Sequence, residues 1–256
     1  MPINKLARHT SGTIFANARQ DFNKNKREMN IRTIFKTCIV VPAAMAALAS
    51  CNTEQTEYFN AYLTAVETEG QPYKCYFISD DSLKVIPLNY YSNIESLKTD
   101  DRLIATFTIP SGEVTNPVEV EFTSFVKMVP QDILQTSAPD TVGNDPADPQ
   151  VMWQSGGIEG TSRFLTINFI YQASTSGIQH KIYLIDDLTA ENPDEDGYYH
   201  LKFRHDANKD QLQLSASSVA TFPLPEKYTA PGIKGIKVDF NTISEEKDST
   251  LTVNFK

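Results

Sequence analysis

The sequence predicts an all-β protein, in which a small OB-like barrel is followed by an antiparallel β-sandwich. Three observations predict this fold class. Short runs rich in Val, Ile, Phe, Tyr and Thr alternate with turn residues, and no long helical periodicity appears after Cys51. The runs also fall into two series, which a segment rich in proline and aspartate separates. We therefore expect two consecutive β-domains.

The first 50 residues are expected to precede the folded domains. Residues 1–28 are polar and basic, and we interpret them as an upstream extension from a misplaced start codon, with a genuine extension as the alternative. Residues 29–50 have a positive start, a short apolar run and small residues at the end, the order of a secretory signal peptide. The apolar run is too short to span a bilayer as a stable helix.

Cys51 stands where this signal ends. "LASC", Leu48–Cys51, has the form of a lipobox, in which the thiol receives diacylglycerol before cleavage exposes the cysteine as the new N-terminus. The alternative is an ordinary signal cleaved near Ser50. Residues 51–57 are expected to be a tether, either a solvated linker or an acidic export signal. Because two or more acyl chains anchor stably, we expect an outer-membrane lipoprotein that faces the cell surface or the periplasm.

The mature chain is strongly acidic. Of the 23 basic and 32 acidic residues, 8 basic and 2 acidic ones precede residue 51, which leaves 15 and 30 and a net charge of −15. A field of this sign repels phosphate backbones and anionic lipid, so we expect no nucleic acid partner and membrane contact only through the anchor. Three cysteines, with Cys38 in the signal and Cys51 lipidated, leave Cys75 without an intramolecular partner.

Residues 58–130 are expected to form the OB-like domain. About five strands in roughly 75 residues suit a small, highly curved barrel. The expected strands are 58–68, two strands around a turn at Asp80 and Asp81 within 72–88, 101–110 and 117–130, with one helical turn at 94–98. Cys75 alternates with aromatic residues and is expected to be a small buried hydrophobe.

Residues 131–150 carry three prolines and four aspartates and are expected to be a connector. Residues 151–256 are expected to form the β-sandwich. Its six or so expected strands are 164–174, 180–188, 198–205, 211–224, 235–243 and 249–256.

The second half also resembles a known family. "VGNDPADP", Trp153, "FLTINFIYQ", "HKIYLI" and "LKFRHDANKD" appear in the order of the signatures of NigD-like lipoproteins. The resemblance covers the mature chain and implies an OB-like N-terminal domain, a C-terminal β-sandwich and a lipoprotein signal. It implies no catalytic residue, because the family defines none. Its association with a bacteriocin locus implies that an immunity role is an alternative function.

The histidines are expected to be structural. His200 and His205 lie an odd number of residues apart on one expected strand, so their side chains point to opposite faces and cannot chelate one metal together. His180 and His205 fall within the family-like motifs and are expected to form hydrogen bonds inside the sandwich.

Two acidic loops are weak metal candidates. "DANKD" offers Asp206, Asn208 and Asp210, the start of a calcium loop, but it lacks the later glycine and glutamate, which favours a polar hairpin turn. "NPDEDG", residues 192–197, is similarly expected to be a solvated acidic turn. We expect no cofactor and no catalytic residue.

Aromatic side chains are the remaining candidates for ligand binding. Trp153 follows the connector, and Tyr90 and Tyr91 fall near loop edges, where exposed rings stack on sugars or anchor a partner protein. The alternative is that they cap a core, with Trp153 wedged between the domains. The sequence therefore predicts a non-catalytic binding or accessory module of the cell envelope, with a glycan, peptide or protein ligand. The alternatives are a bacteriocin immunity or inhibitor protein and, as a third class, a hydrolase.

Overall fold

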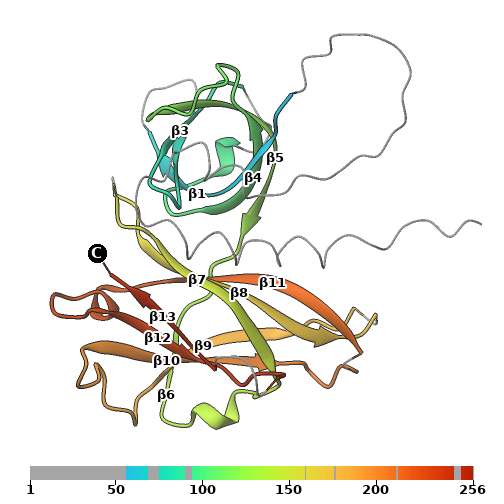
Figure 1. Ribbon diagram of the computed structural model, residues 1–256, viewed down its shortest axis with the longest axis vertical. Coiled ribbons are helices and arrows are strands. Elements are labelled where there is room, and N and C mark those ends of the chain that lie inside the picture. Colours follow the sequence, from blue (N-terminus) through green and yellow to red (C-terminus); the bar gives the residue numbers. More distant parts are fainter. Residues whose placement is uncertain are drawn as a thin grey trace, which may run out of the picture.

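A computed structural model describes residues 56–68, 75–89, 94–158, 160–175, 177–211, 213–244 and 249–255. These residues form an all-β fold, which confirms the fold class predicted from the sequence. A closed barrel lies at one end and a two-layered sandwich at the other, and β5 leads from the first to the second (Figure 1).

Five strands close the barrel in the order β1-β2-β3-β5-β4. They are β1 (Phe59–Glu67), β2 (Cys75–Ser79), β3 (Lys84–Pro87), β4 (Arg102–Thr108) and β5 (Val118–Met128). A 3-10 turn, η1 (Ile94–Ser96), lies between β3 and β4. The β3–β5 pair is parallel and the other pairs are antiparallel. Because β4 also pairs with β1, the barrel closes without leaving an open sheet edge.

Inward-facing apolar side chains fill the barrel, and their alternation with outward-facing ones is clearest on β4 and the first half of β5. On β4, Leu103, Ala105 and Phe107 are fully buried in the barrel core, while Ile104 between them is exposed on the outer wall. Cys75 belongs to the same core, as the sequence predicts, and burial raises the pKa of its thiol to about 11. Each apolar side chain removed from water in this way stabilises the fold by about 1.5–3 kcal/mol.

The sandwich has one sheet in the order β13-β12-β10-β9-β6 and a second sheet in the order β11-β8-β7. The first sheet contains β6 (Leu134–Thr136), β9 (Lys181–Asp187), β10 (Tyr198–Asp206), β12 (Gly235–Asp239) and β13 (Thr250–Asn254). The second contains β7 (Ala147–Gly156), β8 (Arg163–Ala173) and β11 (Leu214–Pro223). Two further 3-10 turns are η2 (Pro139–Thr141) and η3 (Glu226–Tyr228). Apolar residues of both sheets meet in one core.

The segment expected to be a connector contributes to the sandwich. Residues 134–136 form β6, which pairs in parallel with β9, and β7 begins at Ala147 rather than after residue 150. A three-residue strand gives no readable alternation, and Pro149 conceals the start of β7. Proline is tolerated there because β7 is an edge strand whose pairing with β8 shifts between Pro149 and Val151.

A buried ion pair of the barrel lies at the junction with the sandwich. Arg102 of β4 has a fully buried side chain, and its Nη1 and Nη2 lie 2.5 and 2.8 Å from the two carboxylate oxygens of Asp80. Nη2 also lies 3.3 Å from the Thr166 hydroxyl on β8, and the guanidinium carbon lies 5.3 Å from the Phe164 ring centroid. One arginine therefore contacts both domains at once, and the barrel stands on the β11-β8-β7 sheet (Figure 1).

Candidate functional site

The candidate site lies along the open side of the sandwich. After β5 the chain crosses from one sheet of the sandwich to the other. At Gln131 it still contacts the β11-β8-β7 sheet, because the Gln131 N–H donates to the Thr221 carbonyl on β11. Three residues later, Leu134 begins β6, which belongs to the sheet that contains β9. β6 pairs only with Ile185–Asp187 of β9. Within the described part of the chain, the first half of β9 therefore has no strand on this side.

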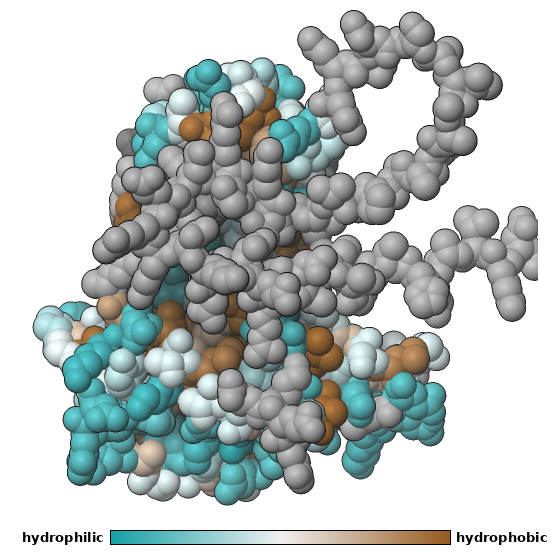
Figure 2. Space-filling view, in the orientation of Figure 1, coloured by the Kyte–Doolittle hydropathy of each residue, from teal (hydrophilic) through white to brown (hydrophobic). Residues whose placement is uncertain are grey.

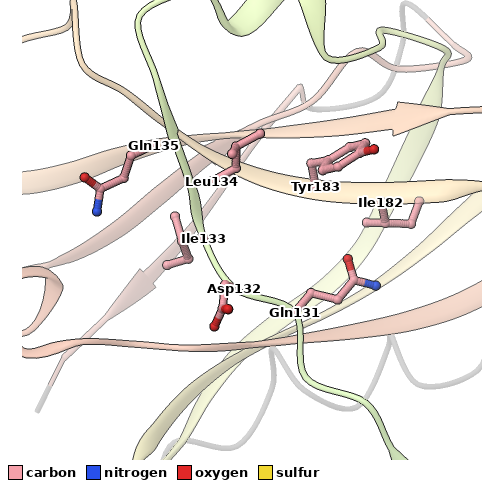
Figure 3. Close-up of a pocket in the computed structure, with 7 residues that line it drawn as sticks. All are labelled: Gln131, Asp132, Ile133, Leu134, Gln135, Ile182 and Tyr183. Atoms are coloured by element: carbon pink, nitrogen blue, oxygen red, sulfur yellow. The ribbon is translucent and has the colours of Figure 1, made fainter.

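Two hollows follow from this gap. The first, of about 520 Å³, is lined by Gln131, Asp132, Ile133, Leu134, Gln135, Ile182 and Tyr183. In Figure 3 the five consecutive residues lie along one extended segment, and Ile182 and Tyr183 lie on the strand that it crosses. The second, of about 310 Å³, shares Gln131 and Ile182 with the first. Because they share these two residues, we treat the two hollows together and call them the edge groove.

The edge groove combines apolar walls with amide groups. The residues that line the second hollow are Gln131, Phe169, Tyr171, Ile178, Gln179, His180, Ile182, Ser218, Val219 and Ala220. Neither set of lining residues contains lysine or arginine, and Asp132 supplies a negative charge. Apolar walls with a few amide and hydroxyl groups suit binding, because the walls provide area and the polar groups provide orientation. On the face shown in Figure 2, hydrophobic residues of the sandwich lie scattered among hydrophilic ones.

A buried chain of hydrogen bonds ends at the edge groove. His180 Nε2 lies 3.0 Å from Asp210 Oδ2, and its Nδ1 lies 2.7 Å from His205 Nε2. His205 Nδ1 lies 3.3 Å from the Pro146 carbonyl. The Tyr171 ring packs against both imidazoles, with centroid distances of 5.1 and 5.2 Å. The hydrogen bonds expected of His180 and His205 are therefore present, and they are made to each other.

The two ends of this chain of groups constrain its ring protons. The Asp210 carboxylate and the Pro146 carbonyl both accept, so the ring nitrogens that face them, His180 Nε2 and His205 Nδ1, donate. Burial lowers the pKa of His205. Ser174 Oγ donates to the Asp210 carboxylate, so Asp210 contacts both a serine and His180.

Trp153 lies at the domain junction. The indole Nε1–H of this half-buried residue donates to Asp80 Oδ2 at 2.7 Å, and its ring centroid is 5.2 Å from that of Tyr62 on the barrel. Trp153 is therefore wedged between the domains, as one of its two sequence interpretations proposed. Its ring is committed to the junction and lies outside the edge groove.

The "DANKD" segment folds as a polar turn. Asn208 and Lys209 have left-handed backbones, with φ of 51° and 62°, and Asp206 Oδ1 accepts from Asn208 N–H at 2.8 Å. Asp210 turns inward to His180, so the candidate ligands do not converge. In the described part of the chain, no three His, Cys, Asp or Glu side chains are placed to hold a metal ion.

Lys237 and His200 hold the "NPDEDG" turn through Asp194. Asp194 Oδ2 lies 2.9 Å from Lys237 Nζ and 2.7 Å from His200 Nε2. These bonds, with one from Tyr198 N–H, hold the pKa of Asp194 below its usual range.

Cys51, Tyr90 and Tyr91 lie outside the described residues. The described residues also contain no helix of the length and apolarity needed to cross a membrane.

Sequence reasoning missed most of the edge groove. Gln131, Asp132 and Ile133 fell in the expected connector, and Ile182 and Tyr183 were expected only as part of a strand. The one available signal was the acidic "DANKD" turn, which follows the histidine at the end of a strand, because a carboxylate in such a turn can bind a nearby imidazole. Asp210 of this turn does bind a histidine. Its partner is His180, just before β9, and His180 in turn contacts His205.

Comparison with known proteins supports the architecture. Residues 130–255 match the NigD-like C-terminal beta sandwich domain. A protein of unknown function from Bacteroides vulgatus has 21% identity and a TM-score of 0.62, covering 78% of this chain and 92% of that one. A candidate lipoprotein from Bacteroides fragilis has 11% identity and a TM-score of 0.53, covering 78% and 96%. A NigD-like immunity protein from Bacteroides caccae has 17% identity and a TM-score of 0.51, covering 79% and 94%. No curated protein matches. At these identities the structures show a shared fold alone.

Proposed function

The chain belongs to the NigD-like family through its C-terminal sandwich, and from that premise we propose that it is a non-catalytic binding module of the cell envelope. The edge groove is the ligand site, and the lipid on Cys51 is the anchor. The observation that carries the proposal is the pair of adjoining hollows on the open side of the sandwich. Their lining offers apolar area and amides, and the nearby histidines are occupied by Asp210 and by each other.

The rigid junction supports a role in presenting this groove. Arg102, Asp80 and Trp153 join the two domains through buried or half-buried groups, so the barrel and the sandwich hold a fixed relation. The barrel then acts as a spacer between the tether and the groove. A module of this kind needs no cofactor and recognises its ligand by shape and hydrogen bonding.

Matched leucine substitutions test the site. The mature chain is screened against an immobilised glycan array and against a phage-displayed library of random linear peptides. Leu134→Arg places a charge in the edge groove, whereas Leu88→Arg places it at the edge of the barrel, where the exposure is similar at 41% against 38%. We expect binding by the wild type and by Leu88→Arg, and loss with Leu134→Arg. Equal binding by all three proteins contradicts a ligand site in the edge groove.

The anchor and its orientation need a separate experiment. Protease treatment of intact cells, with lysed cells as the control, reports which side of the outer membrane carries the domains. Loss of the domains from intact cells supports capture of an extracellular ligand, and protection until lysis supports an envelope partner. Cys51→Ser, which removes the thiol, should release the protein from the membrane fraction.

Acidity favours a second function, the immunity or inhibitor role. A net charge of −15 after residue 50, from 15 basic and 30 acidic residues, would steer a cationic toxin toward this protein. The two functions differ in salt dependence. Steered association slows steeply as ionic strength rises, whereas binding through apolar walls and amides changes little.

A further inference from the structure

β11 is a long edge strand with little of the usual protection among the described residues: Gln131 covers it at Thr221 and Pro223 ends it, but residues 214–220 carry neither a charge nor a proline. It pairs with β8 over ten residues without a register shift, and it lies at the end of its sheet. No charged residue occurs from Leu214 to Leu224, and Pro223 is its last residue. Proteins usually protect such edges with charges, prolines, bulges or short length, because unpaired backbone groups recruit other chains.

Two other edges of the sandwich, β7 and β6, show that protection. β7 has Pro149 at a register shift, and Ala147 N–H donates to the Asn241 carbonyl. β6 is three residues long. β11 thus differs from β6 and β7, and at ten residues it is twice as long as β13, the remaining edge strand.

Backbone direction along β11 can be read from two hydrogen bonds. Leu224 N–H donates to the Arg163 carbonyl on the β8 side, while the Thr221 carbonyl accepts from Gln131 on the opposite side. Backbone groups of an antiparallel strand alternate in direction from one residue to the next. The N–H and C=O groups of Val219 and Ser217 therefore point toward the outer edge, in line with Thr221.

The second hollow of the edge groove adjoins this edge. Ser218, Val219 and Ala220 form one wall, and Ile178 and Ile182 contribute apolar atoms to the lining. A strand added along β11 would place alternate side chains toward this hollow, where an apolar side chain fits. Asp132 and the absence of lysine and arginine from the lining favour a basic residue beside it.

We propose that β11 binds an extended segment of another protein by strand addition, with an apolar side chain of that segment in the second hollow and a basic residue near Asp132. This inference rests on the proposed function and names its ligand class. Main-chain hydrogen bonds supply affinity in this mode, and pockets for alternate side chains supply specificity. The selected ligand should therefore alternate apolar and polar residues.

A proline scan of the edge tests strand addition. Ser217→Pro removes an outward N–H without touching the ladder to β8, and edge strands tolerate proline in this orientation. Ser217→Thr is the matched control, because it keeps both the N–H and the hydroxyl. Peptides selected from the phage library on the wild type should bind Ser217→Thr equally well and Ser217→Pro at least tenfold more weakly. Thermal unfolding of both variants confirms that they fold.

Methylation of the peptide provides a second measurement that does not depend on any variant. Two versions of the peptide are compared, one with N-methyl groups on its odd-numbered residues and one with them on its even-numbered residues. One version should lose binding and the other should bind almost as before, because only one of the two sets of amides faces β11. Equal effects of both sets overturn strand addition. If peptides bind Ser217→Pro as well as the wild type but fail to bind Leu134→Arg, strand addition is wrong and the edge groove stands.

The remaining outcomes also decide the question. If no peptide is selected, strand addition is overturned, and the glycan array alone decides the proposed function. If sedimentation shows that the wild type dimerises and that Ser217→Pro does not, the occupant of the edge is a second copy of this chain. That result would overturn the assignment to another protein.

Discussion

Asp80→Asn at the junction should destabilise the protein by about 3 kcal/mol, the lower part of the range for breaking a buried ion pair. Three donors converge on the Asp80 carboxylate, namely Arg102 Nη1 at 2.5 Å, Arg102 Nη2 at 2.8 Å and Trp153 Nε1 at 2.7 Å. Asparagine offers one oxygen in place of two. Either orientation of the amide therefore sets its NH₂ against at least one of these donors and leaves the fully buried guanidinium without a counter-charge.

A double-mutant cycle separates the pair from its surroundings. Arg102→Met replaces the cation with an apolar side chain, and the double variant Arg102→Met/Asp80→Asn removes both charges. We expect the double variant to be at least about 2 kcal/mol more stable than the sum of the single effects predicts, because neither change then leaves an unpaired buried charge.

Urea unfolding of the mature chain provides the assay. Trp153 is the one tryptophan of the sequence, so its fluorescence reports the junction, while circular dichroism in the far ultraviolet reports all strands. A loss below about 1 kcal/mol for Asp80→Asn, the range of an exposed pair, would refute the reasoning. Additive single effects would refute it as well.

Two further predictions concern titratable groups. Cys75 should resist alkylation at about pH 8, well below its pKa of about 11, and react only after unfolding, as peptide mapping by mass spectrometry can show. Hydrogen bonds from Lys202 and Thr189 lower the pKa of Asp187 to about 2, so its stabilisation is complete above an unfolded pKa of about 3.9 and is lost as pH falls through about 2. Asp187→Asn should therefore reduce the free energy of unfolding by about 1–2 kcal/mol near pH 7, and urea titrations should show that difference vanishing near pH 2.

Part of the site was predictable because it depends on neighbours in sequence. His200 and His205 alternate on β10, so their separation to opposite faces follows from period two alone. The "DANKD" turn likewise follows from the residues that compose it. Asp210 was a different case, because its partner His180 precedes it by 30 residues and reaches it only after β9 and β10 pair.

The edge groove was not predictable from the sequence, because it lies where β6 stops pairing with β9 and segments from both sheets come together. Its walls come from segments around residues 131, 180 and 219, and no local pattern states where β6 stops pairing with β9. At the junction between the domains, the position of one residue was predictable and its hydrogen-bond partner was not. The position of Trp153 after the connector suggested a wedge between domains, but its acceptor, Asp80, was expected only as a turn residue.

The sequence by itself determined the class of fold, the two series of strands, the buried state of Cys75 and the structural nature of the histidines. Each of these depends on periodicity, charge count or turn chemistry, which are local properties of the chain. The tertiary structure alone decided that residues 134–136 complete a sheet, that Arg102 contacts two domains and that β11 stands at the edge of its sheet. Those features depend on strand order and on contacts between residues tens of positions apart, which period and composition do not encode.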